Sequence, residues 1–235
     1  MAEHIYREFD AELEAIRSGV LNMGGQVEQQ LVRALDILRQ DEGAEAIDAV
    51  GSAEAAINQA QILIDQQCMQ MIARRQPTAI DLRTILTVIK IVNDLERIGD
   101  EAKKIAYKAA AAKESPRLAQ MRLAEIGRAS GLARDMLQMA LDAFARSDAS
   151  AAAEVVGHDE AIDVIFQSIM RQLISYMMED PRTIGAALEI VFIAKAIERI
   201  GDHAKNIAES VVQVVKGKDV RHATAEQIRA EVSGE

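Results

Sequence analysis

The sequence predicts an all-α protein built as two tandem three-helix bundles. Apolar residues make up 49% of its 235 residues and aromatic residues only 3%, while Ala, Leu, Ile, Glu and Arg dominate. Only three prolines interrupt the chain, and no Asn-Gly or Asp-Gly hairpin turn occurs. A twelve-residue phrase also occurs twice, as LERIGDEAKKIA at 95–106 and as IERIGDHAKNIA at 197–208, with nine identical positions. These observations favour a duplicated helical unit.

Helical periodicity runs through nearly the whole chain. In the first segment, Val20, Val27 and Leu31 recur at helical spacing. The interruptions are short, and the clearest are QDEG at 40–43 and RSDAS at 146–150. We therefore expect six long helices, at 3–40, 44–75, 78–112, 116–146, 149–179 and 182–216.

Each proline stands where one of these helices is expected to begin. Pro77, Pro116 and Pro181 fit the first helical turn, where a missing backbone N–H costs little. Ser115 and Asp180 precede two of them and are favourable N-cap residues. The prolines therefore mark helix starts rather than kinks.

The repeat extends beyond the doubled phrase. EAAIN at 54–58 resembles DEAID at 159–163 with an offset of 105, whereas the doubled phrase has an offset of 102. The offset is constant within a helix and changes between helices, as expected when insertions fall in loops. We therefore predict a first bundle at 1–113, a second at 114–217, and a polar, frayed tail at 218–235.

Charge and motif content argue against several functions. The net charge of −10 makes direct binding to DNA or RNA unfavourable. No run of 18 apolar residues and no signal pattern are found, so we expect a cytoplasmic protein in which the single Cys68 is a small buried hydrophobe. There is no Walker A loop, dinucleotide fingerprint or nucleophile–histidine pair, so we expect no enzyme. A carboxylate-bridged metal enzyme of helical-bundle type and a purely structural scaffold are the alternatives.

The doubled phrase places two acidic residues on one helix face in each half. Glu96 and Asp100 are four residues apart, as are Glu198 and Asp202. This spacing brings the two carboxylates of each pair together on a helix, on the side that continues the apolar stripe. Two like charges that are partly shielded from water repel each other and require compensation.

Three kinds of compensation are open at this stage. A metal ion suits paired carboxylate oxygens. Alternatively, Arg97 and Arg199 can serve as charge partners across helices. In the third case the acidic face opens on a polar groove. Gly99 and Gly201 lie between the paired acids and each cost about 1 kcal/mol of helix propensity, which indicates close approach of another helix or room for a ligand.

The chain as a whole resembles the PhoU family. The resemblance rests on DLERIGDEAKKIA and KAIERIGDHAKNIA, preceded by QPTAIDLRTILTV and YMMEDPRTIGAAL, and spans residues 4–215. It implies two three-helix bundles related by pseudo-twofold symmetry. It also implies iron or zinc clusters, or other divalent or ferric ions, held by an acidic motif in each half. On this chain the motif corresponds to Glu96, Asp100, Glu198 and Asp202.

Further ligands are needed because two carboxylates do not complete a metal shell. The candidates are Asn58, Asp159 and Asp163 on the preceding helix of each half. The alternative interpretation is that these three residues belong to a solvent-exposed helix face. Glu101 and His203 follow the motif aspartates and are weaker candidates, because one residue along a helix turns roughly 100° away from the carboxylate face.

The resemblance also implies a function. PhoU proteins are cytoplasmic negative regulators of the phosphate-starvation response. They link the ATPase subunit of the phosphate-specific ABC transporter to the sensor histidine kinase PhoR, and they restrain phosphate uptake. We therefore expect an adaptor that forms a homodimer, binds no nucleic acid and meets the membrane only through its partners.

Overall fold

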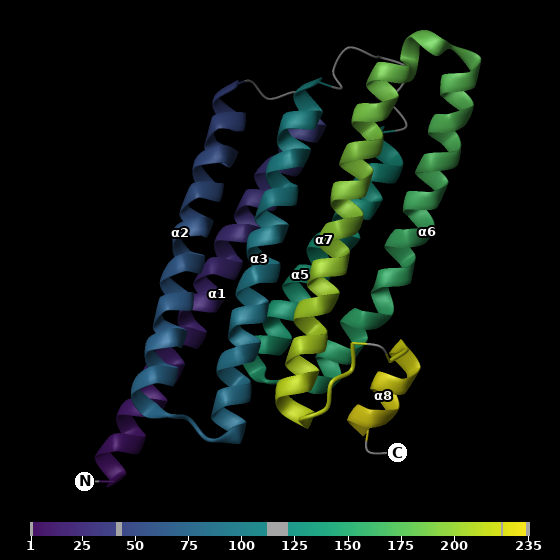
Figure 1. Ribbon diagram of the computed structural model, residues 1–235. Helices are drawn as coiled ribbons and strands as arrows, with labels where there is room; N and C mark the ends of the chain where they lie inside the picture. The colour runs from purple at the N-terminus through teal and green to yellow at the C-terminus, as the bar shows by residue number, and fades with distance from the viewer. Residues whose placement is uncertain (1, 41–43, 112–121, 222, 234–235) are drawn as a thin grey trace.

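The computed structural model describes residues 2–40, 44–111, 122–221 and 223–233, and every regular element in these ranges is helical. The elements are α1 (Ala2–Gln40), α2 (Ala44–Arg75), α3 (Ala79–Ala111), the π-helical turn η2 (Arg122–Ile126), α5 (Gly127–Arg146), α6 (Ala149–Glu179), the 3-10 turn η3 (Pro181–Thr183), α7 (Ile184–Lys216) and α8 (Ala225–Ser233) (Figure 1). The predicted all-α helical-bundle fold is confirmed. No helix in the described ranges is long and apolar enough to cross a membrane.

Two sets of three helices lie side by side. The helices α1, α2 and α3 pack on one another, as do α5, α6 and α7. The two sets meet where α3 packs along α7, and these two helices run antiparallel (Figure 1). Buried apolar side chains from both sets form one continuous cluster. The predicted boundary near residue 113 falls within 112–121, outside the described residues, and stays a prediction.

Helix ends follow the local chemistry of the sequence. Ser147 adopts a left-handed conformation (φ 51°) after α5, and Asp148 then accepts hydrogen bonds from the backbone N–H groups of Ser150 and Ala151. Asp180 accepts from the N–H of Arg182 and begins the 3-10 turn before α7. The last long helix therefore starts at Ile184, two residues later than predicted. The predicted Ser115 cap lies outside the described residues.

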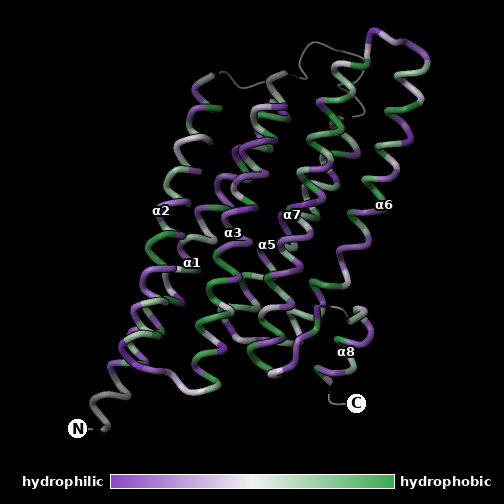
Figure 2. Tube along the Cα trace, in the orientation of Figure 1, coloured by the Kyte–Doolittle hydropathy of each residue, from purple (hydrophilic) through white to green (hydrophobic). Residues whose placement is uncertain are grey.

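The long helices are amphipathic, with one apolar and one polar side, so hydrophilic and hydrophobic residues alternate along each of them (Figure 2). On α3, Leu95 and Ile98 are fully buried, whereas Arg97 between them is exposed. Cys68 is buried as predicted, and burial together with nearby Asp65 raises the pKa of its thiol to about 11. Burial of the apolar side of each long helix explains why a chain with so few aromatic residues forms a stable core.

The prediction of a frayed tail is wrong for residues 225–233, which form α8. Thr224 and Gln227 begin this helix with a reciprocal cap, in which each side chain accepts a hydrogen bond from the other residue's backbone N–H. The helix packs against α6, and its Ile228 is fully buried. A nine-residue helix with one buried apolar residue gives too weak a periodicity to be recognised in a polar segment.

The buried Ile228 should hold α8 on the bundle. Replacing Ile228 with alanine is expected to weaken this docking by about 2–4 kcal/mol, since a buried isoleucine loses both transfer energy and packing. Amide hydrogen exchange in 225–233 should accelerate strongly while exchange in α3 and α7 stays slow. Glu226→Ala, at an exposed position of the same helix, is the control. Equal exchange in the two variants would contradict this account of α8.

Candidate functional site

The acidic residues of the doubled phrase lie on α3 and α7, the two helices at the centre of the molecule. A cleft of about 740 Å³ opens between these helices. It is lined by charged and polar side chains from both halves: Glu96, Arg97, Asp100, Glu101, Lys104, Arg199, Asp202, His203, Lys205, Asn206, Glu209 and Arg221. Three of the four motif acids therefore reach a polar cleft, whereas Glu198 does not line it.

The first centre comprises Glu54, Asn58, Glu96, Asp100 and Lys103, contributed by α2 and α3. Lys103 Nζ lies 2.8 Å from Glu54 Oε2, and Asn58 donates from Nδ2 to Glu54 Oε1 over 3.1 Å. The Asn58 Oδ1 atom is buried without a hydrogen-bond partner in the part of the chain that the structure describes. Burial and the charge of Asp100 raise the pKa of Glu96, while Lys103 lowers that of Glu54. The pair Glu96 and Asp100 thus carries repulsion that Lys103 does not remove.

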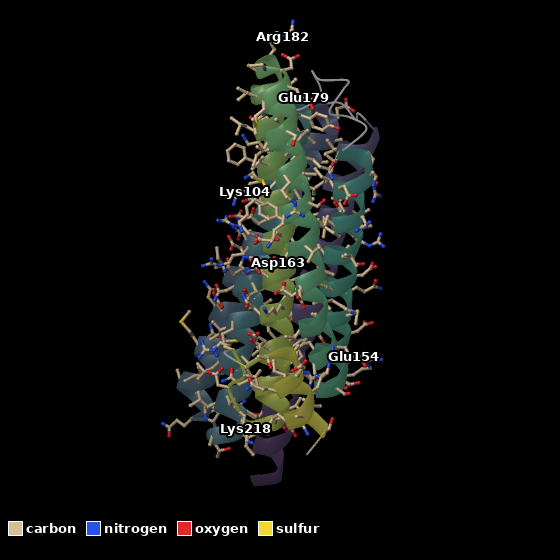
Figure 3. All side chains as sticks on the ribbon, turned by 90° about the vertical axis from the view of Figure 1, so that its right-hand side faces the viewer. Lys104, Glu154, Asp163, Glu179, Arg182 and Lys218 are labelled. Carbon is tan, nitrogen blue, oxygen red and sulfur yellow. The ribbon has the colours of Figure 1, made fainter. Side chains whose placement is uncertain are left out.

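The second centre comprises Asp159, Asp163, Glu198, Asp202 and Lys205, contributed by α6 and α7. Lys205 Nζ lies 2.7 Å from Asp159 Oδ2, which repeats the Glu54–Lys103 contact of the first half. Burial and neighbouring carboxylates, Glu198 foremost, raise the pKa of Asp202 to about 6. The pKa of Asp163 is raised for the same reasons, burial first and then Asp159. Asp163 lies about midway along the bundle (Figure 3).

The glycines inside the two motifs allow a neighbouring helix to pack closely. A Cβ atom at Gly99 would lie 3.4 Å from Ile57 Cδ1 of α2, and one at Gly201 would lie only 2.8 Å from Ile162 Cδ1 of α6. Ile57 and Ile162 are equivalent in the repeat, at an offset of 105. Of the two reasons considered for these glycines, the structure therefore shows the close approach of a helix.

The first half contains a buried polar residue that the second half lacks. Gln30 of α1 is fully buried and donates from Nε2 to the carbonyl of Val50 over 3.2 Å. Its Oε1 has no hydrogen-bond partner among the described residues and would lie 3.0 Å from a Cβ at Gly99. This oxygen faces the turn of α3 that carries Glu96 and Asp100. The repeat places Met136 at the equivalent position of the second half.

The predicted charge partners and weaker ligand candidates connect the two halves. Arg199 donates from Nη1 to Glu101 Oε1 over 3.1 Å, and Lys104 donates to the same oxygen. His203 Nδ1 lies 2.9 Å from Asp94 Oδ1, across the contact between α7 and α3. Glu101 and His203 are therefore engaged in contacts between α3 and α7, and they line the same cleft as Glu96, Asp100 and Asp202.

Arg97 remains beside the acids of the first centre. It lines the cleft, and its charge acts to lower the pKa of Glu96. Glu54 was not singled out from the sequence, although it begins the EAAIN segment and stands opposite Asp159 in the repeat. Lys195, which contacts Glu198, was also missed, because the equivalent residue of the first half is Asn93.

The donor chemistry of both centres suits a hard cation, but their present geometry does not form a closed shell. All candidate ligands in the two centres offer oxygen atoms, and the buried Oδ1 of Asn58 accepts no hydrogen bond from any described residue. Within the described ranges, no three His, Cys, Asp or Glu side chains converge closely enough to hold a metal ion. Instead, Glu54 and Asp159 form ion pairs with Lys103 and Lys205. Metal binding would therefore require these side chains to rearrange.

Comparison with known proteins identifies the family. A sequence model described as the PhoU domain matches residues 20–109 and 126–211, one stretch in each half of the repeat. The chain belongs to the PhoU family. The predicted resemblance is thus confirmed.

Relatives match the chain over nearly its whole length. It is 44% identical to the phosphate-specific transport system accessory protein PhoU homolog of Pseudomonas putida, covering all of this chain (100%) and 91% of that protein. It is 39% identical to the Escherichia coli accessory protein PhoU, covering 99% and 95%. The crystal structure of PhoU from Pseudomonas aeruginosa superposes with a TM-score of 0.83 at 44% identity, covering 89% of this chain and 100% of that one.

A more distant relative preserves the same fold. The phosphate transport system regulatory protein PhoU from Streptococcus pneumoniae is 28% identical and superposes with a TM-score of 0.82, covering 90% of this chain and 99% of that one. The two solved PhoU structures thus match this chain over 89% and 90% of its length.

The raised pKa of Asp202 predicts a stability change. In the presence of chelator at pH 8, Asp202→Asn should raise the free energy of unfolding by about 1–2 kcal/mol, a value reduced for solvent screening. The folded-state pKa of about 6 exceeds the unfolded value. The ionised Asp202 therefore lowers the free energy of unfolding fully above pH 6 and has no such effect below about pH 4.

The gain from Asp202→Asn should therefore shrink as the pH falls from 8 to 5, as measured by urea unfolding. Asp142→Asn, at an exposed position of α5, is the matched control. Destabilisation by Asp202→Asn at pH 8 would show that the carboxylate is stabilised by a contact stronger than the repulsion from its neighbours.

Proposed function

We propose that this protein is a regulatory adaptor of a phosphate-specific transport system. It acts in the cytoplasm as a negative regulator of the phosphate-starvation response. As a homodimer it links the ATPase subunit of the phosphate ABC transporter to the sensor histidine kinase PhoR and restrains phosphate uptake. The similarity over the whole length to proteins named for this transport system is the observation that carries the proposal.

The architecture supports an adaptor. Long helices offer extended faces, and apolar side chains remain exposed on several of them, such as Leu63 on α2 and Phe192 on α7. Helical faces of this kind suit recognition by partner proteins. The match extends over 91–95% of the two accessory proteins named above, so the proposal rests on nearly the whole length of each relative.

We also propose that each centre binds a metal ion. In the first half, Glu54, Asn58, Glu96 and Asp100 would hold it, and in the second half Asp159, Asp163, Glu198 and Asp202. A bound cation would supply positive charge between carboxylates that otherwise repel one another. The raised pKa values of Glu96, Asp163 and Asp202 support this role, because burial first and neighbouring carboxylates second disfavour their charged forms, which a bound cation would stabilise.

Metal binding predicts a chelator-sensitive melting temperature. Removing both ions from the native protein should lower its melting temperature by about 10–20 °C when the free ion was near 100 times its Kd at each centre, since a ligand of the folded state stabilises it by mass action. A variant with alanine at Glu96, Asp100, Glu198 and Asp202 should be insensitive to chelator. Glu154→Ala, an exposed α6 carboxylate (Figure 3), should behave like the native protein.

Replacing only one acid pair should empty that half and leave the other half loaded, as measured by metal content per chain. The reading in which the arginines alone compensate the acids predicts the opposite pattern. In that case a chelator changes neither protein, and the fourfold alanine variant is destabilised because its guanidinium partners lose their counter-charge. A native protein that carries no metal and ignores chelator would end the metal proposal.

The regulatory proposal predicts a phenotype. Deleting the gene should leave phosphate-starvation genes expressed at high phosphate, and restoring the chain should return repression. Reporter expression at high and low phosphate measures both effects. Expression that stays repressed in the deletion strain would contradict the proposal. Complementation with the fourfold alanine variant would show separately whether the two centres are needed.

A further inference from the structure

The two centres differ at one position that bears a cation. Lys195 Nζ of α7 lies 2.5 Å from Glu198 Oε2. At an offset of 102, the repeat places Asn93 at the equivalent position of α3. Asn93 instead donates to the carbonyl of Ile89 and accepts a hydrogen bond from Gln61. Only the second centre therefore carries this additional ammonium group.

The local structure holds Lys195 beside the acid. Its ammonium lies 5.5 Å from the centre of the Phe166 ring on α6, within the range of a cation–π contact. Glu198 Oε2 is buried and, apart from this ion pair, has no hydrogen-bond partner in the described part of the chain. The ammonium is thus the charge closest to an oxygen that a metal ion in this centre would need.

A second difference accompanies the first. The repeat aligns Asn58 of the first centre with Asp163 of the second, so the second centre has one more carboxylate as well as one more ammonium. The charge of Lys195 acts on both Asp163 and Asp202, where it opposes the rise in pKa that burial and the neighbouring acids cause. Lys195 therefore balances the whole second centre and not Glu198 alone.

We propose that Lys195 is a tethered cation that competes with a metal ion for the second centre, so that the two centres bind metal with different affinities. This inference rests on the proposed metal binding. A metal ion can use Glu198 only after the ammonium has left it, and the energy of that ion pair is subtracted from the energy of binding. The first centre has no such step at Glu96. Lys195 thus sets affinity without being a ligand.

The test isolates the second centre in the full-length protein. In a background of Glu96→Ala and Asp100→Ala, Mn²⁺ is titrated calorimetrically into the chelator-stripped protein with and without Lys195→Asn. This substitution installs the residue found at the equivalent position of the first half. It should tighten Mn²⁺ binding by about two- to fivefold, the effect of removing one competing ion pair of ordinary strength. Lys195→Arg keeps the charge and should bind as weakly as the native residue.

The converse substitution tests the first centre. In a background of Glu198→Ala and Asp202→Ala, Asn93→Lys should weaken Mn²⁺ binding. Circular dichroism before titration checks that each variant is folded. Asn93 is exposed and Lys195 half-exposed, so both positions should tolerate the substitutions.

The outcomes separate this inference from the metal proposal on which it rests. If Lys195→Asn and the native residue bind Mn²⁺ equally well, competition is wrong while metal binding stands. If Lys195→Arg tightens binding as much as Lys195→Asn, the charge is not the cause and the inference fails. If neither background nor the native protein binds Mn²⁺, zinc or iron, the metal proposal fails and this inference fails with it.

Discussion

Like charges held on the central helices are the constraint around which the rest of the structure is arranged. Each half places two motif carboxylates on a partly buried face and adds acidic or amide side chains from the preceding helix. Burial favours the neutral form of such groups, and their mutual repulsion adds to this effect. The folded chain therefore needs a compensating charge at each centre, and the nearby lysines supply part of it.

The helical core makes this arrangement possible. Gly99 and Gly201 let α2 and α6 approach closely. Ile57 and Ile162 therefore pack against the helical turns that carry the motif acids. Packing between α3 and α7 then brings the two halves against a common cleft. Contacts such as Arg199–Glu101 cross this interface. Close apolar packing thus fixes the positions of the charged groups, and any ion that enters must accommodate a rigid frame of helices.

The sequence predicted the helices and the motif faces well because periodicity and repeat offsets are properties of single helices. It predicted contacts between helices less well. His203 was considered beside the acids of its own half but contacts Asp94, because the crossing of α3 and α7 is not encoded by spacing along either helix. Glu54 could have been found, since the repeat aligns it with Asp159. The helix α8 could not, because one buried isoleucine leaves no periodic pattern.

Divergence between the two halves follows electrostatics. The first centre has three carboxylates and one lysine, and the second has four carboxylates and two lysines. When Lys195 is counted with the second centre and the cleft-lining Arg97 is left aside, both centres have the same formal charge of −2 at neutral pH with all groups ionised. The extra acid Asp163 and the extra base Lys195 belong together, because either alone would change the charge of a partly buried centre by one unit. A duplicated fold can therefore alter the polar side chains of one half without changing the charge of its centre.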